Sequence, residues 1–533
     1  MKKVWNVIKR SDGSSPNTLI SEILKNRGID NAAEFMSPTD DCLIPFSAFK
    51  NIDKAYEAVR ETLVNHKKVV IFADVDTDGC TSAAIMYRWI KLFTDNVDVI
   101  INSGKQHGIQ PDFDYNRLNG VGLLIIVDAI QNDTAAYKTI LNKGIKLVVL
   151  DHHVVSQEVL DIAEDICLVS SSIDNYPNPE LSGAGVTWKF CKYLDGKFGV
   201  DAAKNLVDLA AVGIVADVCD VGKDSMENRY VCHKGFATTR NKALTNIIGN
   251  YSFNSTSVSF SIAPLVNCAN RLGRNERALR LFTTDDYAEI YTIIKELKDD
   301  KEVQKQTVAK LYKSAVSQLD KQQNNKCLWA YVTGAENLGG LIATKIASDY
   351  GKPSIVITDS DGVNYSGSMR AVGIKDFRTV LNQCDGVSCN GHEQAAGISI
   401  ACSKLDSVYK QVEELLKDYE FENVVDIDAE IPLLWIPKIA METVELNRIS
   451  GKGFRPIQFL IELDNSKDEF STRWFPSFGK HLSFTTKNPK IQFIKWNCDS
   501  NVDLNASRVK CVGTIDAGSN GPQVILNEFE QES

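Results

Sequence analysis

The sequence lacks the long apolar run, about 18 residues, that a membrane-spanning helix requires. The opening stretch from Met1 to Ile8 also turns polar too early for a secretory signal peptide. Among the 13 cysteines there is no Cys-x-x-Cys pair, which argues against a disulfide framework and against a structural zinc site. We therefore expect a cytoplasmic protein with reduced thiols and no contact with a membrane.

An excess of basic residues is missing as well, because the formal net charge is -10 at pH 7. Nucleic-acid-binding proteins contact phosphates through local basic patches, so the net charge alone argues mildly against such a partner. It does not exclude a nuclease, since a metal-dependent active site needs several acids. With 44% hydrophobic and 24% charged residues, the composition is that of an ordinary globular protein, and the length of 533 residues suggests about three or four domains.

The hydrophobic pattern changes several times along the chain and predicts a fold of the α/β class. Short apolar runs alternate with amphipathic stretches in the first half, and short strands alternate with turns in the last hundred or so residues. A charged stretch at 285–320 with apolar residues at helical spacing predicts one long solvated helix. The predicted parts are a helical N-terminal segment (1–55), a doubly wound parallel-sheet domain (56–240), a connecting region containing the long helix (241–324), a smaller α/β domain (325–424) and an OB-fold-like β-barrel (425–533).

Three continuous apolar runs in the first half have the character of strands that are buried on both faces of a parallel sheet. They are Val69–Ala73, Leu123–Val127 and Ile145–Leu150. Helical patterns at Ser82–Leu92 and Thr134–Asn142 lie between them. The alternation predicts the doubly wound arrangement of the 56–240 domain.

An acid follows each of these three predicted strands: Asp74, Asp128 and Asp151. The carboxyl ends of parallel strands line one edge of an open sheet, so three distant segments should deliver carboxylates to one crevice. Asp76 and Asp78 crowd the first of these turns. Like charges this close repel one another, and burial would raise their pKa values. A divalent cation would remove that conflict.

Two imidazoles and one further acid extend the predicted cluster. His152 and His153 follow Asp151, and imidazole with carboxylate suits Mn²⁺, and also Zn²⁺ or Fe²⁺, better than an all-oxygen Mg²⁺ cage. The apolar helix predicted at 206–218 carries Asp217 near its end, where an acid is usually a cap but here could be a fourth arm of the cluster. Six or seven such ligands are enough for two metal ions about 3.5–4 Å apart, which could activate a water and hold a phosphodiester.

Other interpretations of these motifs are weaker. The Asp-x-Asp-x-Asp-Gly pattern that begins at Asp74 also occurs in calcium-binding loops, but such a loop needs Glu at its twelfth position, which is Ile85 here. An Asp-His-His triplet alone is a weak signal and is often structural. The combination of strand-end acids, the triplet and Asp217 is much more specific than any one of them.

Ordered motifs along nearly the whole chain resemble the RecJ-type single-strand exonucleases of the DHH phosphoesterase superfamily. The Gly391–Gly397 motif resembles the hallmark of the DHH-associated domain of that family, and Gly451–Pro456 with Gly479–Leu482 resembles, less specifically, its OB-fold domain. The other motifs are Asp74–Ser82, Asp128, Asp151–His153, Tyr176–Pro179, Ser182–Gly185, Gly213–Val218, Glu227–Arg229, Ile262–Pro264, Asn267–Gly273 and Gly367–Arg370.

The resemblance implies a hydrolase that removes nucleotides from single-stranded DNA in the 5′→3′ direction by a two-metal mechanism, with Mn²⁺ or Mg²⁺ as the cofactor. It implies metal ligands at Asp74, Asp76, Asp78, Asp128, His152 and Asp217. It implies catalytic roles for Asp76, Asp78, Asp128, His152, His153 and Asp217. Asp151 would be an outer residue that fixes the tautomer of a histidine. Substrate phosphates would be bound by Lys105, His107, Arg271, Ser368, Arg370 and His392.

The sequence departs from the family at three places that do not include a predicted metal ligand. A basic residue and a Gly-Tyr-Gly-like turn are common where this chain has Lys105-Gln-His107-Gly108. Asn270 replaces a usual glycine, and Phe454 replaces the asparagine of a Gly-x-Gly-Asn motif. These departures bear on substrate preference. An alternative view of Gly391–Gly397 is a glycine-lined turn that leads into tight helix packing.

The predicted parts also suggest how a single strand would be held. Two lobes joined by a long helix would form a channel with the metals at its base, and the barrel could add a basic, aromatic surface. Candidates on that surface are Lys480, His481, Lys495, Trp496 and Arg508, although Trp496 could instead belong to the barrel core.

Two other functions remain open at this point. The chain could cleave oligoribonucleotides or cyclic dinucleotides, although such enzymes of the superfamily are usually shorter and lack the barrel. It could also be a non-catalytic replication scaffold, although such proteins lose metal ligands that this chain retains. By analogy, a single-strand-binding protein or a helicase is a plausible partner.

Overall fold

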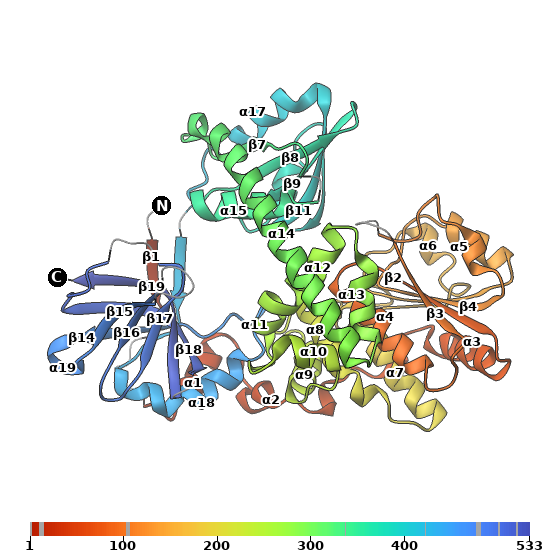
Figure 1. The fold of residues 1–533 in the computed structure, drawn as a ribbon, viewed down its shortest axis with the longest axis horizontal. Helices are drawn as coiled ribbons and strands as arrows, with labels where there is room; N and C mark the ends of the chain where they lie inside the picture. Colours follow the sequence, from red (N-terminus) through yellow and green to blue (C-terminus); the bar gives the residue numbers. More distant parts are fainter. Residues whose placement is uncertain are drawn as a thin grey trace. The chain divides into compact units, whose positions relative to one another are not determined.

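The computed structural model of the 533-residue chain consists of two units (Figure 1). One contains Met1–Asn6 and Lys298–Val425, and the other contains Val7–Leu297 and Asp426–Ser533. The long helix α14 (Tyr287–Leu319) connects them and confirms the helix predicted at 285–320. None of the helices among the described residues is long and apolar enough to cross a membrane. The structure describes residues 3–9, 15–102, 107–335, 337–421, 423–475, 481–498, 502–518 and 521–532.

A five-stranded parallel sheet forms the centre of the second unit, with the strand order β3-β2-β4-β5-β6. The three predicted strands are β2, β4 and β5, and the two outer strands were not predicted. The middle residues of β2, β4 and β5 are buried on both faces, which explains the continuous apolar runs. The strands are β2 (Lys68–Ala73), β3 (Val97–Ile101), β4 (Val121–Val127), β5 (Lys146–Asp151) and β6 (Leu168–Ser170).

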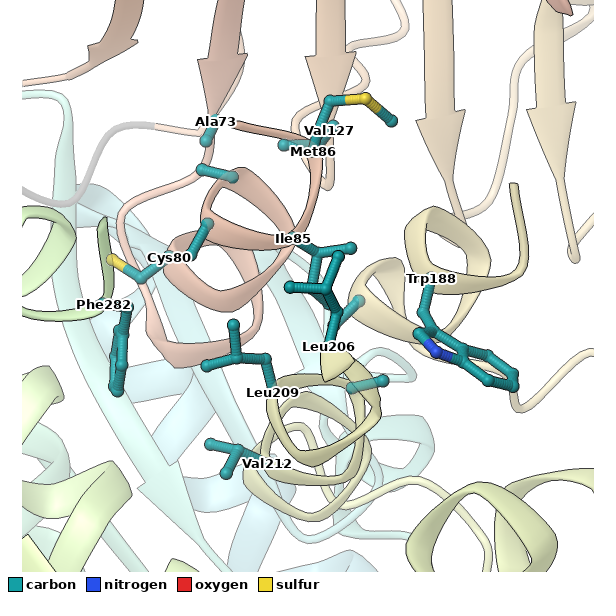
Figure 2. Close-up of a cluster of buried hydrophobic side chains, with 14 of the residues drawn as sticks. Ala73, Cys80, Ile85, Met86, Val127, Trp188, Leu206, Leu209, Val212 and Phe282 are labelled. Carbon is teal, nitrogen blue, oxygen red and sulfur yellow. The ribbon is translucent and has the colours of Figure 1, made fainter. Parts of the chain in front are cut away.

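Two hydrophobic layers cover the faces of this sheet. On one face, α4 (Thr77–Ile90) and α8 (Val207–Ala216) pack with α7 (Gly183–Phe198) in a large apolar cluster. Figure 2 shows side chains of this cluster, among them Ile85 of α4, Trp188 of α7 and Leu209 of α8. On the other face, α5 (Ala135–Asn142) packs on the sheet. The sheet is therefore doubly wound, as predicted.

The remaining helices of this unit belong to different hydrophobic clusters. The helices of the N-terminal segment are α1 (Leu19–Asn26), α2 (Ala32–Met36) and α3 (Ile52–Val64). The other helices are α6 (Gln157–Leu160), α9 (Met226–Ala237), α10 (Lys242–Ile248), α11 (Ser255–Ser257), a π-helical turn at Val258–Ile262, α12 (Ala263–Arg271) and α13 (Asn275–Thr283).

The N-terminal segment, predicted to be helical, begins with a strand. Residues Lys3–Val7 form the strand β1, which pairs with β12 (Asn423–Ile427) from more than 400 positions further along. The alternation of residue types in a five-residue strand is too short to be distinguished from a loop, and its partner is far away in the sequence.

The other unit contains a mixed five-stranded sheet with the order β10-β11-β9-β8-β7. The Gly391–Gly397 motif forms the tight hairpin between β10 and β11, so its interpretation as a turn into helix packing was wrong. The strands are β7 (Leu328–Tyr331), β8 (Ser354–Ser360), β9 (Asn364–Arg370), β10 (Val387–His392) and β11 (Ala395–Ala401), with the helices α15 (Gly339–Tyr350), α16 (Phe377–Leu381) and α17 (Leu405–Leu416).

A seven-stranded mixed sheet with the order β13-β14-β18-β19-β17-β16-β15 forms the C-terminal part of the chain. This arrangement is compatible with an OB-like domain, but its edge strands β13 and β15 do not pair with each other among the described residues. The elements are β13 (Ala429–Glu430), α18 (Ile436–Asn447), β14 (Phe459–Asp464), α19 (Asn465–Asp468), β15 (Ser471–Phe475), β16 (His481–Thr485), β17 (Gln492–Lys495), β18 (Arg508–Gly518) and β19 (Gly521–Glu532).

The five predicted nucleic-acid contacts of this domain have different environments. Trp496 is 50% exposed, so its alternative assignment to the core was wrong, and its ring meets that of buried His481 edge to face. Lys495 bonds to the carbonyl of Asn527, and Arg508 pairs with Asp464 at 3.4 Å. The fifth residue, Lys480, lies outside the described residues.

The buried side chain of Arg229 joins three distant segments of the second unit. Its guanidinium donates to the backbone carbonyls of Phe35 at 2.6 Å, Val221 at 3.1 Å and Ile449 at 3.2 Å. The group lies over the ring of Phe35, and burial lowers its pKa to about 9. The N-terminal segment, the α/β domain and the C-terminal domain therefore share one polar contact in an otherwise apolar setting.

Arg229→Leu should lower the free energy of unfolding by about 3 kcal/mol, because three buried carbonyls would lose their donor. Urea unfolding of the whole chain, followed by circular dichroism, measures this loss. Arg60→Leu is the matched control, since Arg60 is partly exposed and pairs with Glu57 on the same helix. The control should leave the free energy of unfolding almost unchanged, because the pair is screened by solvent. Equal losses in the two variants would contradict the assigned role of Arg229.

Candidate metal centre

The turn after β2 delivers three carboxylates to the start of α4. Asp74 follows the strand, and Asp76 is the N-cap of α4, where its side chain accepts a hydrogen bond from the backbone of Gly79 at 3.0 Å. Asp78 lies in the first helical turn. The partial positive charge of a helix N-terminus stabilises acids at these positions. The sequence motif is therefore also the beginning of a helix.

Asp78 is held by the N-terminus of a second helix, α7. Its Oδ2 accepts from the backbone N–H of Gly183 at 2.7 Å, and its Oδ1 accepts from the N–H of Ala184 and the hydroxyl of Ser182, both at 3.0 Å. Ser182 also caps α7. The side chain of Asp78 is almost completely buried, so these three donors fix the direction of its carboxylate.

Asp128, Asp217 and His152 complete the inner cluster. The Nε2 atom of His152 lies 3.2 Å from Asp128 Oδ1, 3.6 Å from Asp217 Oδ2 and 3.9 Å from Asp78 Oδ2. Asp128 follows β4 with a positive φ of 53°, and Asp217 follows the last residue of α8. One imidazole nitrogen thus faces three carboxylates that come from three separate elements.

Asp151 organises the histidine pair and does not face the cluster as a free acid. Its Oδ1 accepts from the backbone N–H of His152 at 2.7 Å and of His153 at 2.8 Å, and lies 2.9 Å from His153 Nδ1. Its Oδ2 accepts from the N–H of Ile130 at 2.8 Å. This arrangement fits the prediction that Asp151 fixes the tautomer of a histidine. A proton on His153 Nδ1 leaves Nε2 of that ring available to bind another group.

The surroundings shift the pKa values of the acids in opposite directions. Burial, followed by the charges of Asp74 and Asp78, raises the pKa of Asp76 to about 8. Burial and the charge of Asp78 raise the pKa of Asp217 to about 7. Burial would also raise the pKa of Asp151, but the hydrogen bond and charge of His153 and the charge of His152 lower it below its ordinary value.

The remaining members of the cluster follow the same physical causes. Burial raises the pKa of Asp78. The charge of His152 and three hydrogen bonds lower it, but their effect is smaller than that of burial. Burial and the charges of Asp78 and Asp76 raise the pKa of Asp128 well above its ordinary value. Burial lowers the pKa of His152. Burial would also lower the pKa of His153, but its hydrogen bond to Asp151 raises it to about 9.

The donor set fits divalent cations. Among the described residues, three groups of side chains bring potential ligand atoms within 4.8 Å of one another. The buried Oδ1 atoms of Asp74 and Asp128 have no hydrogen-bond partner, which is costly unless a cation takes that place. Mixed carboxylate and imidazole ligands suit Mn²⁺. The groups are Asp74 with Asp76 and Asp128, Asp78 with His152 and Asp217, and Asp128 with His152 and His153.

Two glycines allow the helices to approach these carboxylates. A Cβ atom on Gly183 would lie 2.6 Å from the side chain of Asp128, and one on Gly213 would lie 2.2 Å from Asp78 Oδ1. In the sequence, these glycines were noticed only as parts of longer motifs. The role of the N-terminus of α7 in holding Asp78 was not predicted. The available signal was the Ser182-Gly-Ala-Gly185 pattern, which combines an N-cap residue with small residues.

The predicted substrate contacts near the cluster are only partly described. Lys105 lies outside the described residues. His107 Nδ1 lies 3.2 Å from Asp74 Oδ2, and its Nε2 lies 2.7 Å from the carbonyl of Ile130, so this ring is tied to the cluster. Arg271 ends α12, and no ion pair of its guanidinium is formed among the described residues. That cation is therefore suited to a phosphate.

Three predicted contacts lie in the other unit. Ser368 and Arg370 are on β9, and His392 ends β10. The side chains of Ser368 and Arg370 face the N-terminus of α15, where a Cβ atom on Gly340 would lie 2.5 Å from Arg370 Nη2. Arg370 also donates to the hydroxyl of Thr344 at 3.1 Å. A helix N-terminus, a hydroxyl and a guanidinium together suit an anion.

Comparisons with known proteins give a consistent picture. Residues 68–214 match the family model described as the DHH family, N-terminal domain. YorK of Bacillus phage SPbeta, with a proposed single-strand DNA-specific exonuclease activity, is 27% identical over 578 residues, which cover 96% of each chain. The single-stranded-DNA-specific exonuclease RecJ of Bacillus subtilis is 24% identical over 93% of this chain and 65% of its own length. The crystal structure of RecJ from Thermus thermophilus in complex with Mn²⁺ superposes with a TM-score of 0.78, covering 99% of this chain and 80% of that one at 21% identity.

The metal-free protein should lose stability as the pH rises from 5 to 8.5. Asp76 and Asp217 have raised pKa values in the folded state, about 8 and about 7, against about 3.9 in an unfolded chain. The folded state therefore holds more protons than the unfolded chain between about pH 4 and 8, so its stability decreases across this window. Calorimetric melting after chelation should show the decrease, and Mn²⁺ should reverse it at pH 8.5. A pH-independent difference between Asp76→Asn and the unaltered chain would contradict the raised pKa of Asp76.

Gly213→Ala should weaken Mn²⁺ binding about tenfold or more, because the added methyl group would displace Asp78 from its hydrogen bonds with the N-terminus of α7. Calorimetric titration of the metal-free protein measures the affinity. Gly196→Ala in α7 is the control, since a Cβ atom there would meet nothing within 4 Å. The control should keep its Mn²⁺ affinity and gain roughly 0.5–1 kcal/mol of stability. Unchanged Mn²⁺ affinity in Gly213→Ala would show that the close approach is not needed.

Proposed function

We propose that this chain, a RecJ-type protein of the DHH superfamily, is a metal-dependent exonuclease that hydrolyses single-stranded DNA from the 5′ end. The activity named for its relatives supports the reaction, and the 5′→3′ direction rests on the family resemblance alone. The alternatives are a superfamily phosphodiesterase of oligoribonucleotides or cyclic dinucleotides and a non-catalytic replication scaffold.

The observation that carries the proposal is the convergence of buried carboxylates and imidazoles at one edge of the parallel sheet. Two of the ligand groups, Asp74 with Asp76 and Asp128, and Asp78 with His152 and Asp217, could each hold one ion. A pair of Mn²⁺ or Mg²⁺ ions bound there would activate a water molecule and neutralise the charge of the scissile phosphate. A degenerate scaffold would have no reason to retain this set.

The surrounding residues have distinct tasks in this proposal. Asp151 orients the ring of His153 through the contact with its Nδ1 atom, so that this ring can contact a phosphate oxygen. Arg271 is held near the acidic turn, because Asn267, one helical turn earlier, bonds to Thr77 at 2.9 Å. Its guanidinium can bind a phosphate of the strand.

The other unit would contribute further phosphate contacts through Ser368, Arg370 and His392. The anion-binding arrangement of β9 and the N-terminus of α15 supports this role. The exposed ring of Trp496 supports base stacking on the C-terminal domain. The proposal also includes the division of the chain into the five predicted parts and a cytoplasmic location. It includes a single-strand-binding protein or a helicase as a partner.

Digestion of end-labelled DNA in the presence of Mn²⁺ tests the function directly. The chain should release nucleotides from the 5′ end of single-stranded DNA and leave duplex DNA intact. Asp128→Asn should reduce the rate by about 1,000-fold or more, since it removes a shared ligand. Asp165→Asn, at an exposed position outside the cluster, should digest at the rate of the unaltered chain.

Parallel reactions with short RNA oligomers and a cyclic dinucleotide separate the alternatives. Faster turnover of either substrate than of long single-stranded DNA would favour the small-substrate enzyme. Loss of all activity in the unaltered chain, at Mn²⁺ concentrations that saturate the site, would favour the scaffold. Release of label from the 3′ end first would reverse the proposed direction.

A further inference from the structure

The turn that presents Asp217 is strained. Val218 has a positive φ of 57°, a conformation that β-branched residues rarely adopt. Such strain persists only when the surroundings hold the backbone in place, and it is concentrated at functional sites. On the helical side, three backbone hydrogen bonds hold the turn: Asp217 N–H to Gly213 at 2.9 Å, Val218 N–H to Val215 at 3.2 Å and Cys219 N–H to Ile214 at 3.0 Å.

The far side of the same turn is held by a loop of the C-terminal domain, Gly451–Phe454. The backbone N–H of Val221 donates to the carbonyl of Lys452 at 3.0 Å. The ammonium group of Lys452 donates to both carboxylate oxygens of Glu180, at 2.9 and 2.8 Å. Glu180 also lies 3.4 Å from the backbone N–H of Asp220, so one ion pair connects the loop to the segment that follows Asp217.

The two segments fit so closely that glycine is needed on each side. A Cβ atom on Gly453 would lie 2.3 Å from both carboxylate oxygens of Asp220, and Gly453 also has a positive φ of 76°. A Cβ atom on Gly222 would lie 2.5 Å from the carbonyl of Gly453. Asp220 is itself fixed, because its Oδ1 accepts from the N–H of Gly222 at 2.7 Å. The contact is therefore a specific fit and not a loose surface contact.

We infer that the Gly451–Phe454 loop of the C-terminal domain is a positioning element of the metal centre, which holds Asp217 in place through the Asp220–Gly222 segment. Lys452 and Gly453 are its positioning residues. The inference rests on the proposed metal centre, and it assigns the C-terminal domain a role in metal binding that is independent of any contact with DNA. It predicts that a substitution in this loop weakens the binding of one metal ion even when no DNA strand is bound.

The ligand groups give this inference a site-specific signature. Asp217 belongs to the group with Asp78 and His152, and it is absent from the group with Asp74, Asp76 and Asp128. A displaced Asp217 should therefore weaken the binding of one ion and leave the other unchanged. General destabilisation of the fold would weaken both.

Calorimetric titration of the metal-free 533-residue chain with Mn²⁺, without DNA, tests the inference. Gly453→Ala should weaken one of two binding steps about tenfold or more, and Lys452→Met should weaken the same step by a smaller factor. Lys452→Arg should restore most of the affinity, because arginine can form the same pair with Glu180. Lys510→Met is the matched control, since Lys510 forms an equally exposed pair with Glu532 at 2.9 Å within the C-terminal sheet, and it should bind Mn²⁺ as the unaltered chain does.

Each outcome decides between the possibilities. Unchanged binding in Lys452→Met and Gly453→Ala would overturn the inference, as would equal weakening of both steps in a folded Lys452→Met variant. If Gly453→Ala does not fold, the two Lys452 variants still decide. A chain that binds Mn²⁺ with this dependence but does not digest DNA would refute the proposed function and leave the inference standing. A chain that binds no Mn²⁺ would overturn both.

Discussion

The burial of several carboxylates at one site is the constraint on which this structure depends. Burial, followed by the charges of neighbouring acids, raises the pKa of Asp76 to about 8 and that of Asp217 to about 7 when no cation is present. Two carboxylate oxygens are buried without any hydrogen bond. A folded chain accepts such costs only if another group supplies positive charge. The cluster is therefore incomplete without a cation, and the remaining scaffold serves to hold the acids in spite of their repulsion.

The scaffold meets this requirement mainly with backbone groups. Two helix N-termini, those of α4 and α7, point at Asp76 and Asp78, and backbone N–H groups also hold Asp151. Backbone donors add no mobile charge and lose no side-chain entropy when they bind. They do require close approach, which is why Gly183 and Gly213 lie against carboxylates. Because the packing around the metal centre is this close, added methyl groups are poorly tolerated there.

The sequence predicted the parts of this arrangement that follow from local patterns. The three buried strands, the long helix α14 and the acids at the strand ends were all apparent from hydrophobic runs and their flanking residues. Sequence reasoning missed β1, whose partner β12 lies more than 400 residues away, and it missed the buried contact of Arg229. Neither has a local signature, because both depend on segments that meet only after folding. The exposure of Trp496 was not predictable for the same reason, since an aromatic residue at a strand end suits either a core or a surface.

The C-terminal domain is a further case in which tertiary contacts decide the interpretation. The sequence suggested that this domain adds a basic, aromatic surface for nucleic acid. Arg229 instead bonds to Ile449, and the loop around Lys452 lies against the strained turn after Asp217. A helix end that carries a ligand has few constraints of its own, because its last carbonyls and the residues beyond them lack helical partners. A second segment must then supply the rigidity that a metal site requires. Because the C-terminal domain provides that segment, catalysis and strand binding need not be separable functions of separate domains in this chain.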